Sequence, residues 1–154
     1  MTANVATSRT VASAQDLLSL SQAELDELYE KSPVGEIPTG DTRGTAIVKP
    51  TWFGKLAAPL ARLLFWQGKV FNPAQGDLKN KVSPFGVKSI RAKVYVGESW
   101  KVKGQQAIII DYSDTSFVAK KIRDEIRQIG PGLYLGKVFW GRTHILDFSL
   151  SLDK

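Results

Sequence analysis

The stretch Ile90-Arg-Ala-Lys-Val-Tyr-Val96 decides the fold of this chain. Its apolar residues alternate strictly with two basic residues and a tyrosine. Successive side chains of a β-strand point to opposite faces of the sheet, so this period of two predicts a strand with one buried face. Gly97 follows and is expected to end it.

Segments on both sides of this strand have a similar β-rich composition and are separated by turn residues. We predict further strands over 42–49, 66–72, 78–83, 106–112, 133–140 and 144–150, the last two as a hairpin around Gly141-Arg142. Many short strands in succession indicate a barrel or a sandwich. The predicted fold class is mainly β with flanking helices: an antiparallel up-and-down β-barrel of about eight strands, whose interior can hold one small ligand.

Two segments before and after the first strand have helical spacing. The first is 16–31, in which Ser21 and Glu24 form a capping-box pattern, so that the helix begins at Asp16 or at Ser21. The second is 52–65, which we predict to cover the barrel after the first strand and to be kinked by Pro59.

A third helix is predicted from Val118, Ile122, Ile126 and Ile129, which repeat at intervals of four, four and three. The charged residues between them are expected to form its solvated face; they are Arg123, Asp124, Glu125 and Arg127. Asp111, just before this helix, is expected to cap it.

The length of 154 residues suits one domain, which we divide into a disordered leader (1–15), a helix and linker (16–40) and the barrel (41–154). The chain has no cysteine, which excludes disulfides and thiolate chemistry and fits a cytoplasmic protein. His144 is its one histidine, so zinc sites rich in histidine are excluded, and a position near a turn predicts a surface residue. No motif for a cofactor is present, and none is predicted.

The net charge of +6 favours anionic partners, or simply solubility. Basic and aromatic residues mix along 49–69, which suits peripheral contact with an anionic membrane, a lid over the barrel, or a plain covering helix. The usual nucleic-acid-binding motifs are absent, which argues against nucleic acid as a partner, although an oligonucleotide-binding barrel remains an alternative. The sequence leaves the oligomeric state open.

The order of elements resembles the calycin-type barrels, which include lipocalins and fatty-acid-binding proteins. The resemblance is architectural and covers 41–150. The first strand has Arg43-Gly44-Thr45 where lipocalins carry Gly-x-Trp, and the last strand lacks the Arg-x-Tyr pair of fatty-acid-binding proteins. The resemblance implies a carrier of a hydrophobic ligand, or a barrel enzyme that isomerises or cyclises one.

Several residues stand out as candidates for lining a ligand site. Some are polar residues on strand faces that are otherwise apolar, where a buried polar group needs a partner. Others are tryptophans near the ends of predicted elements. The candidates are Trp66, Asn80, Trp100, Tyr112, Tyr134, Lys137, Trp140 and Asp147. For Asn80 a structural role and for Lys137 a position at the barrel rim are the simpler interpretations.

Three functional hypotheses follow. The first is a carrier or sensor that binds an apolar or amphipathic, lipid-like small molecule inside the barrel. The second is a barrel isomerase or cyclase that uses Tyr112, Tyr134, Asn80 and Asp147 as acid–base groups. The third is a basic module that binds partners at its surface.

Overall fold

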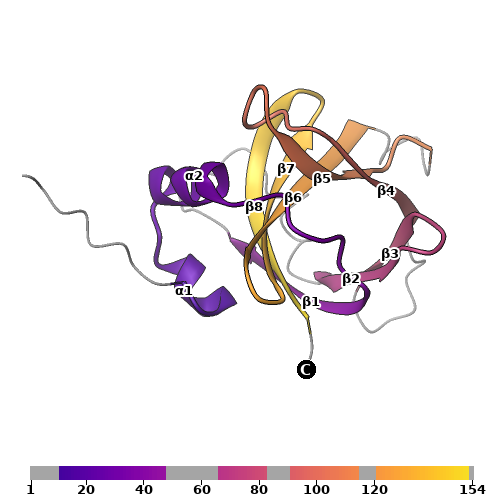
Figure 1. Ribbon diagram of the computed structural model, residues 1–154, viewed down its shortest axis with the longest axis horizontal. Coiled ribbons are helices and arrows are strands. Elements are labelled where there is room, and N and C mark those ends of the chain that lie inside the picture. Colours follow the sequence, from indigo (N-terminus) through magenta and orange to yellow (C-terminus); the bar gives the residue numbers. More distant parts are fainter. Residues whose placement is uncertain (1–10, 48–65, 83–90, 115–120, 153–154) are drawn as a thin grey trace, which may run out of the picture.

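The chain folds into a closed eight-stranded β-barrel in a computed structural model that describes residues 11–47, 66–82, 91–114 and 121–152. The side chains of residues 66, 67 and 80–82 lie outside this description. The strands follow one another around the barrel in sequence order (Figure 1). They are β1 (Gly40–Ile47), β2 (Trp66–Asn72), β3 (Asp77–Val82), β4 (Arg91–Glu98), β5 (Gln106–Asp111), β6 (Ile122–Gly130), β7 (Leu133–Trp140) and β8 (Thr143–Leu152).

Every neighbouring pair of strands is antiparallel, and β1 pairs with β8 to close the barrel. This closure joins Thr42 to Leu152 at one end and Ile47 to Asp147 at the other. The predicted fold class, an antiparallel up-and-down barrel, is therefore confirmed. β4 runs through Gly97 to Glu98, so the expectation that this glycine ends the strand is wrong.

Two short helices precede the barrel: α1 (Ala14–Leu18) and α2 (Gln22–Lys31). The chain thus interrupts the single helix predicted over 16–31. Ser21 is the N-cap of α2: its hydroxyl accepts from the Glu24 amide and the Glu24 carboxylate accepts from the Ser21 amide, as the capping-box pattern predicted. The covering helix predicted over 52–65, and residues 1–10 of the predicted disordered leader (1–15), lie outside the described residues. Ala14 and Gln15, at the end of that predicted leader, belong to helix α1.

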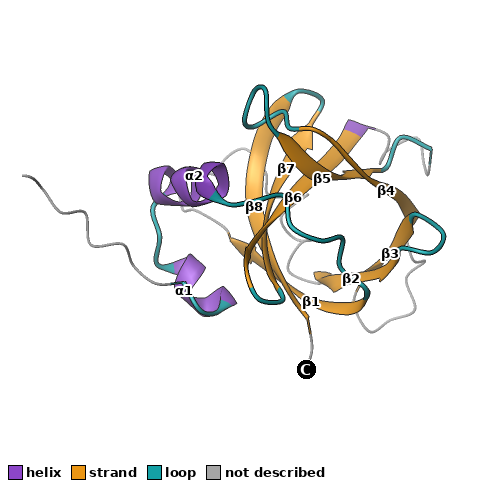
Figure 2. Ribbon diagram, in the orientation of Figure 1, coloured by secondary structure: helices purple, strands orange, loops and turns teal. Residues whose placement is uncertain are grey.

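The helices pack against the outer face of the barrel, so that this wall is buried on both sides (Figure 2). Leu17 of α1 and Leu25 of α2 belong with Leu135 of β7 to an apolar cluster separate from the one inside the barrel. Consequently β6, β7 and β8 carry unbroken runs of buried residues, whereas β4 alternates between buried and exposed ones.

The helix predicted over 118–129 is wrong within the described residues, because 122–130 form strand β6 between β5 and β7. The isoleucines therefore do not share one face, as they would on a helix. Ile126 faces the barrel interior, and Ile129 packs on the outer cluster under α2. The charged residues are not a solvated face: Asp124, Glu125 and Arg127 are all buried. Asp111 accordingly caps a turn, accepting from the Ser113 amide at 2.8 Å.

A segment of chain between α2 and β1 crosses one end of the barrel and closes it; we call residues 33–39 the strap (Figure 1). Val34 and Ile37 pack against the apolar interior. The Gln128 amide donates to the carbonyl of Val34, and the Tyr134 hydroxyl donates to the carbonyl of Glu36. Gly35 has φ +76°, and a Cβ there would lie 2.2 Å from Cβ of Gln128, so the strap needs glycine at this point.

Candidate functional site

Three polar side chains meet inside the barrel, and we call them the lumen triad: Lys69, Tyr112 and Asp124. Nζ of Lys69 donates to the Tyr112 hydroxyl at 2.5 Å and to Oδ2 of Asp124 at 3.1 Å. The Tyr112 hydroxyl also donates to Oδ2 of Asp124 at 3.3 Å. β2 and β6 lie four positions apart in the closed ring of eight strands, so Lys69 reaches across the barrel to the opposite wall.

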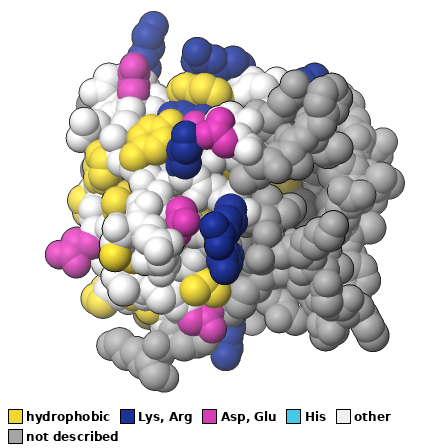
Figure 3. Space-filling model, turned by 90° about the vertical axis from the view of Figure 1, so that its right-hand side faces the viewer, with side chains coloured by type: hydrophobic (Ala, Val, Ile, Leu, Met, Phe, Trp, Pro, Cys, Tyr) yellow, Lys and Arg dark blue, Asp and Glu magenta, His cyan; other side chains and the backbone are white. Residues whose placement is uncertain are grey.

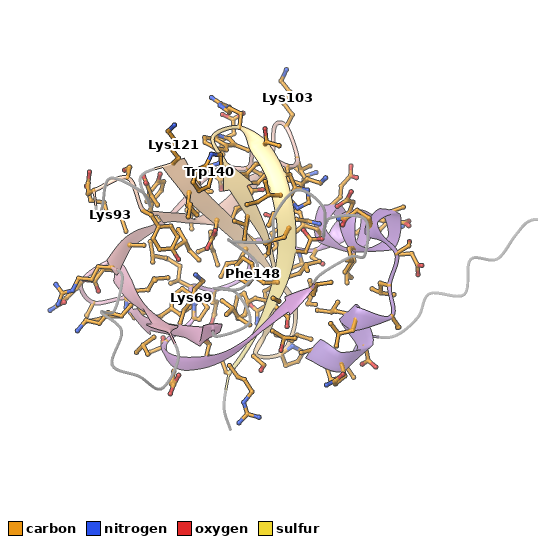
Figure 4. All side chains as sticks on the ribbon, turned by 180° about the vertical axis from the view of Figure 1, so that it is seen from behind. Lys69, Lys93, Lys103, Lys121, Trp140 and Phe148 are labelled. Carbon is orange, nitrogen blue, oxygen red and sulfur yellow. The ribbon has the colours of Figure 1, made fainter. Side chains whose placement is uncertain are left out.

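Local structure holds Lys69 in place. The Thr42 hydroxyl of β1 donates to the Lys69 carbonyl at 2.6 Å and accepts from the Lys69 amide at 3.1 Å. A register shift between Trp66 and Gly68 precedes it. A bulge of this kind re-aims the following side chain, and Figure 4 shows Lys69 pointing into the barrel near Phe148, whereas Lys93 and Lys121 point away from it.

The lumen triad is almost dry, because only 4% of the Lys69 side chain and 5% of the Asp124 side chain are exposed. Burial lowers the pKa of Lys69 and raises the pKa of Asp124, although each charge partly offsets the shift of the other. Oδ1 of Asp124 is buried and has no hydrogen-bond partner among the residues that the structure describes. A buried acceptor without a partner is costly, so this oxygen calls for an explanation.

An apolar wall surrounds the lumen triad. It consists of Phe71, Leu78, Ala92, Val94, Ile108, Ile110, Ile126, Tyr134, Phe148 and Leu150. Phe148 lies directly on Gly136, where a Cβ would come within 2.2 Å of its ring, and the ring centroid is 5.4 Å from Nζ of Lys69. The strap closes the end near Tyr134, while the lumen triad lies toward the other end, at the start of β6.

Lys137 and Asp147 meet, but outside the barrel wall. Nζ of Lys137 donates to Asp147 at 2.8 Å and to Asp26 of α2 at 2.7 Å, and its side chain is fully buried beneath that helix. The predictions that Lys137 lies in the lumen or at the rim are therefore both wrong. Nε2 of His144 lies 2.5 Å from Asp147, and the His144 side chain is 16% exposed, so this histidine is half-buried and the expectation of a surface histidine holds only in part. These four residues form the outer ion cluster, which attaches α2 to the barrel.

Acid is expected to weaken this attachment. Burial raises the pKa of Asp26, but the hydrogen bond and charge of Lys137 outweigh it and lower the pKa from 3.8 to about 2. A carboxyl group with a lowered pKa adds stability that is fully present above its unfolded value and is lost as the pH falls through its folded value. Urea unfolding of the natural chain and of Asp26→Asn should therefore differ above pH 3.8 and converge as the pH approaches 2. A difference that does not change with pH would contradict this role.

The tryptophans do not line the lumen where their side chains are described. Trp140 is exposed. Trp100 lies on the outside, between the guanidinium groups of Arg123 at 3.9 Å and Arg142 at 4.4 Å from its ring. Together these three residues line part of a surface pocket of about 550 Å³. The side chains of Trp66 and Asn80 lie outside the description, so their predicted roles stay predictions, although both backbones are in strands.

Sequence reasoning thus identified Tyr112 and Tyr134 as interior residues and missed Lys69 and Asp124. Tyr112 follows Ile108 and Ile110 on one face of β5, and all three are buried inside. A signal for Asp124 was available, because reading 122–126 as a strand places it between Ile122 and Ile126 on one face. The structure separates Asp147 from Tyr112, since one lies under α2 and the other in the lumen.

The described surface gives no concentrated basic patch on the face seen in Figure 3, where Lys and Arg side chains are interspersed with Asp and Glu. Within the described ranges, no helix is long and apolar enough to cross a bilayer. The basic and aromatic stretch proposed for membrane contact falls largely on 48–65, outside the described residues.

Comparison with known proteins supports the fold. No protein-family model matches the sequence, and no curated protein matches it significantly. The structure is similar to a crystal structure of a protein from Thermomonospora curvata, with a TM-score of 0.65 and 19% sequence identity. The match covers 88% of this chain and 89% of the other. At this identity the likeness concerns the fold alone.

Proposed function

We propose that the protein binds a small molecule with an apolar body and a polar head inside its barrel, as a carrier or sensor. The observation that supports this most directly is the lumen triad: a Lys, a Tyr and an Asp buried in an apolar interior, with one carboxylate oxygen unpartnered among the described residues. Burying charged groups costs free energy because they are removed from water, so these groups are not expected in a core that serves packing alone.

The architecture supports the same proposal. Eight antiparallel strands in sequence order are also the arrangement of the calycin-type barrels, which supports the proposal that this chain is a barrel of that type. The strap closes one end with apolar side chains. An apolar site with a few polar groups that fix orientation is typical of small-molecule pockets. The lack of cysteine supports a cytoplasmic location.

A barrel isomerase is the second candidate, with Lys69 and Asp124 beside Tyr112 in place of the other groups first suggested. A lysine whose pKa is lowered by burial can act as a base, and Lys69 contacts the Tyr112 hydroxyl. The two candidates differ in the fate of the ligand: a carrier returns it unchanged, and an isomerase converts it. Chromatography of the released ligand after incubation distinguishes the two candidates. Mass alone does not, because isomers have the same mass.

Native mass spectrometry of gently purified protein tests binding. We expect a small molecule to co-purify and to be retained less well by Tyr112→Phe, because this change removes only the hydroxyl that bonds to both Lys69 and Asp124 and so holds the carboxylate in position. Tyr95→Phe is the matched control, because the hydroxyl of Tyr95 lies on the exposed outer face of β4. If the natural chain carries no small molecule and binds no apolar probe, the proposal is wrong.

A further inference from the structure

We infer that the head group of this ligand is a neutral hydrogen-bond donor, such as a hydroxyl, and not a carboxylate. The inference rests on the proposed function and names the chemical class that the same site accepts. Oδ1 of Asp124 carries it: this oxygen is buried and without a partner among the described residues, and it belongs to a side chain only 5% exposed. A carboxylate oxygen in this position accepts hydrogen bonds and needs a donor.

The known side-chain donors inside the barrel are directed to acceptors other than Oδ1 of Asp124. Lys69 and Tyr112 both donate to Oδ2 of Asp124, the other oxygen of the same carboxylate. The Tyr134 hydroxyl donates to Glu36 of the strap, at the opposite end of the lumen. None of these three side chains supplies a donor to Oδ1, and we assign that donor to the head group of the ligand.

Charge determines which kind of donor fits. Lys69 and Asp124 are in contact and their formal charges cancel, so this pair offers no net positive charge to an anion. An anionic head placed against Oδ1 would face a like charge at close range in a medium of low dielectric constant. A cationic head would be repelled by the ammonium group of Lys69, which lies beside the same carboxylate. A neutral hydroxyl meets neither repulsion and can donate to Oδ1.

A competition experiment with the natural chain tests the head group. The fluorescent apolar probe N-phenyl-naphthylamine is bound first, and three competitors built on a twelve-carbon chain are added at neutral pH: dodecanol, methyl dodecyl ether and dodecanoate. The ether retains an oxygen but cannot donate. We expect dodecanol to displace the probe at about ten-fold lower concentration than the other two, because only it donates to the carboxylate.

The outcomes separate the inference from the proposed function. Equal displacement by ether and alcohol, or stronger displacement by dodecanoate, overturns the head-group inference while binding in the lumen stands. Failure of the probe and of every competitor to bind overturns the proposed function itself. Displacement led by the alcohol supports both.

Variants show whether Asp124 is the discriminating group. Asp124→Asn keeps the shape of the side chain and removes its charge, so the disadvantage of dodecanoate against dodecanol should shrink about ten-fold. Asp111→Asn, on the outer face of the barrel, should leave the preference unchanged. If Asp124→Asn does not fold, Lys69→Met/Asp124→Leu removes both charges, and this variant should no longer distinguish alcohol from ether. A preference that survives the loss of Asp124 would overturn the assignment.

Discussion

Replacing Glu125 with alanine is expected to lower the free energy of unfolding by about 3–5 kcal/mol, the range for breaking a buried charged network by removing one partner. Its carboxylate is fully buried between β6, α2 and the loop before β5. It accepts hydrogen bonds from Tyr29 Oη at 2.9 Å, Ser99 Oγ at 2.5 Å, Trp100 N at 2.8 Å and Lys101 N at 3.2 Å.

The effect is large because the variant leaves several buried donors without an acceptor. Each unsatisfied buried donor costs about 1–3 kcal/mol, and water reaches some of these positions only if the loop opens. The guanidinium of Arg123, 3.4 Å from Glu125, loses its carboxylate partner as well. The same change loosens α2, since Tyr29 is the residue through which that helix contacts Glu125.

Urea denaturation of the natural chain and of Glu125→Ala measures this difference. Glu27→Ala is the matched control, because Glu27 makes one ion pair, with Lys31, on the exposed side of α2 and should unfold like the natural chain. Glu125→Gln keeps an acceptor of the same size and should lie between the two. Equal stability of Glu125→Ala and Glu27→Ala would show that the network contributes nothing.

Strands with one solvent-exposed face were predictable from the sequence. β4 alternates between exposed and buried residues, and its pattern identified it directly. Turn residues gave the bounds of β2 and β7 to the residue, because Asn72-Pro73 and Gly141-Arg142 stop the pairing. The start of α2 followed from the chemistry of its cap at Ser21.

Strand β6 was missed although β7, which is also buried on both faces, was predicted, so burial alone is not the reason. β6 differs from β7 in carrying several charged residues on its buried faces. Its outer residues Glu125 and Arg127 would indicate solvent on an isolated strand, yet each is buried by partners remote in sequence. Arg127 donates to the carbonyls of Tyr29, Glu30 and Ser32 at the end of α2. A charge satisfied by a distant helix terminus leaves no local signal, so the isoleucine spacing alone suggested a helix.

The structure places the predicted site residues on both sides of the barrel wall, and burial by a helix again explains why the sequence did not show this. Alternation sorts the residues of a strand into two faces but does not say which face is the lumen when a helix covers the outside. Lys137 and Asp147 were recognised as polar residues among apolar ones, and both are buried, but they lie under α2. Lys69 follows Gly68, whose irregular pairing changes the direction of the side chains, so simple alternation could not place it.

A substitution in the lumen triad is expected to cause the second large loss of stability. Lys69→Met is expected to lower the free energy of unfolding by about 3–5 kcal/mol, because it leaves the carboxylate of Asp124 buried without a cation. Lys93→Met, on the exposed face of β4, is the matched control and should unfold like the natural chain. A cost no larger than that of the control would show that the pair is not coupled.

The cost of Lys69→Met should depend on pH in a defined direction. Burial already raises the pKa of Asp124, and the charge and hydrogen bond of Lys69 oppose that rise. Without Lys69 the pKa of Asp124 rises further, and protonation then relieves the buried charge. The variant is therefore expected to be closest to the natural chain at mildly acidic pH and to lose stability as the pH rises through this pKa. Urea midpoints at mildly acidic and mildly alkaline pH measure the difference.

The double variant Lys69→Met/Asp124→Leu separates stability from binding. Replacing a buried ion pair with apolar residues of similar size is often neutral or stabilising, so the double variant should recover most of the stability lost in Lys69→Met. If the lumen triad only supports the fold, nothing else changes. If it receives the head group of a ligand, the stable double variant should bind the apolar probe and no longer discriminate among the competitors. A stable variant with unchanged discrimination would assign the triad to folding alone.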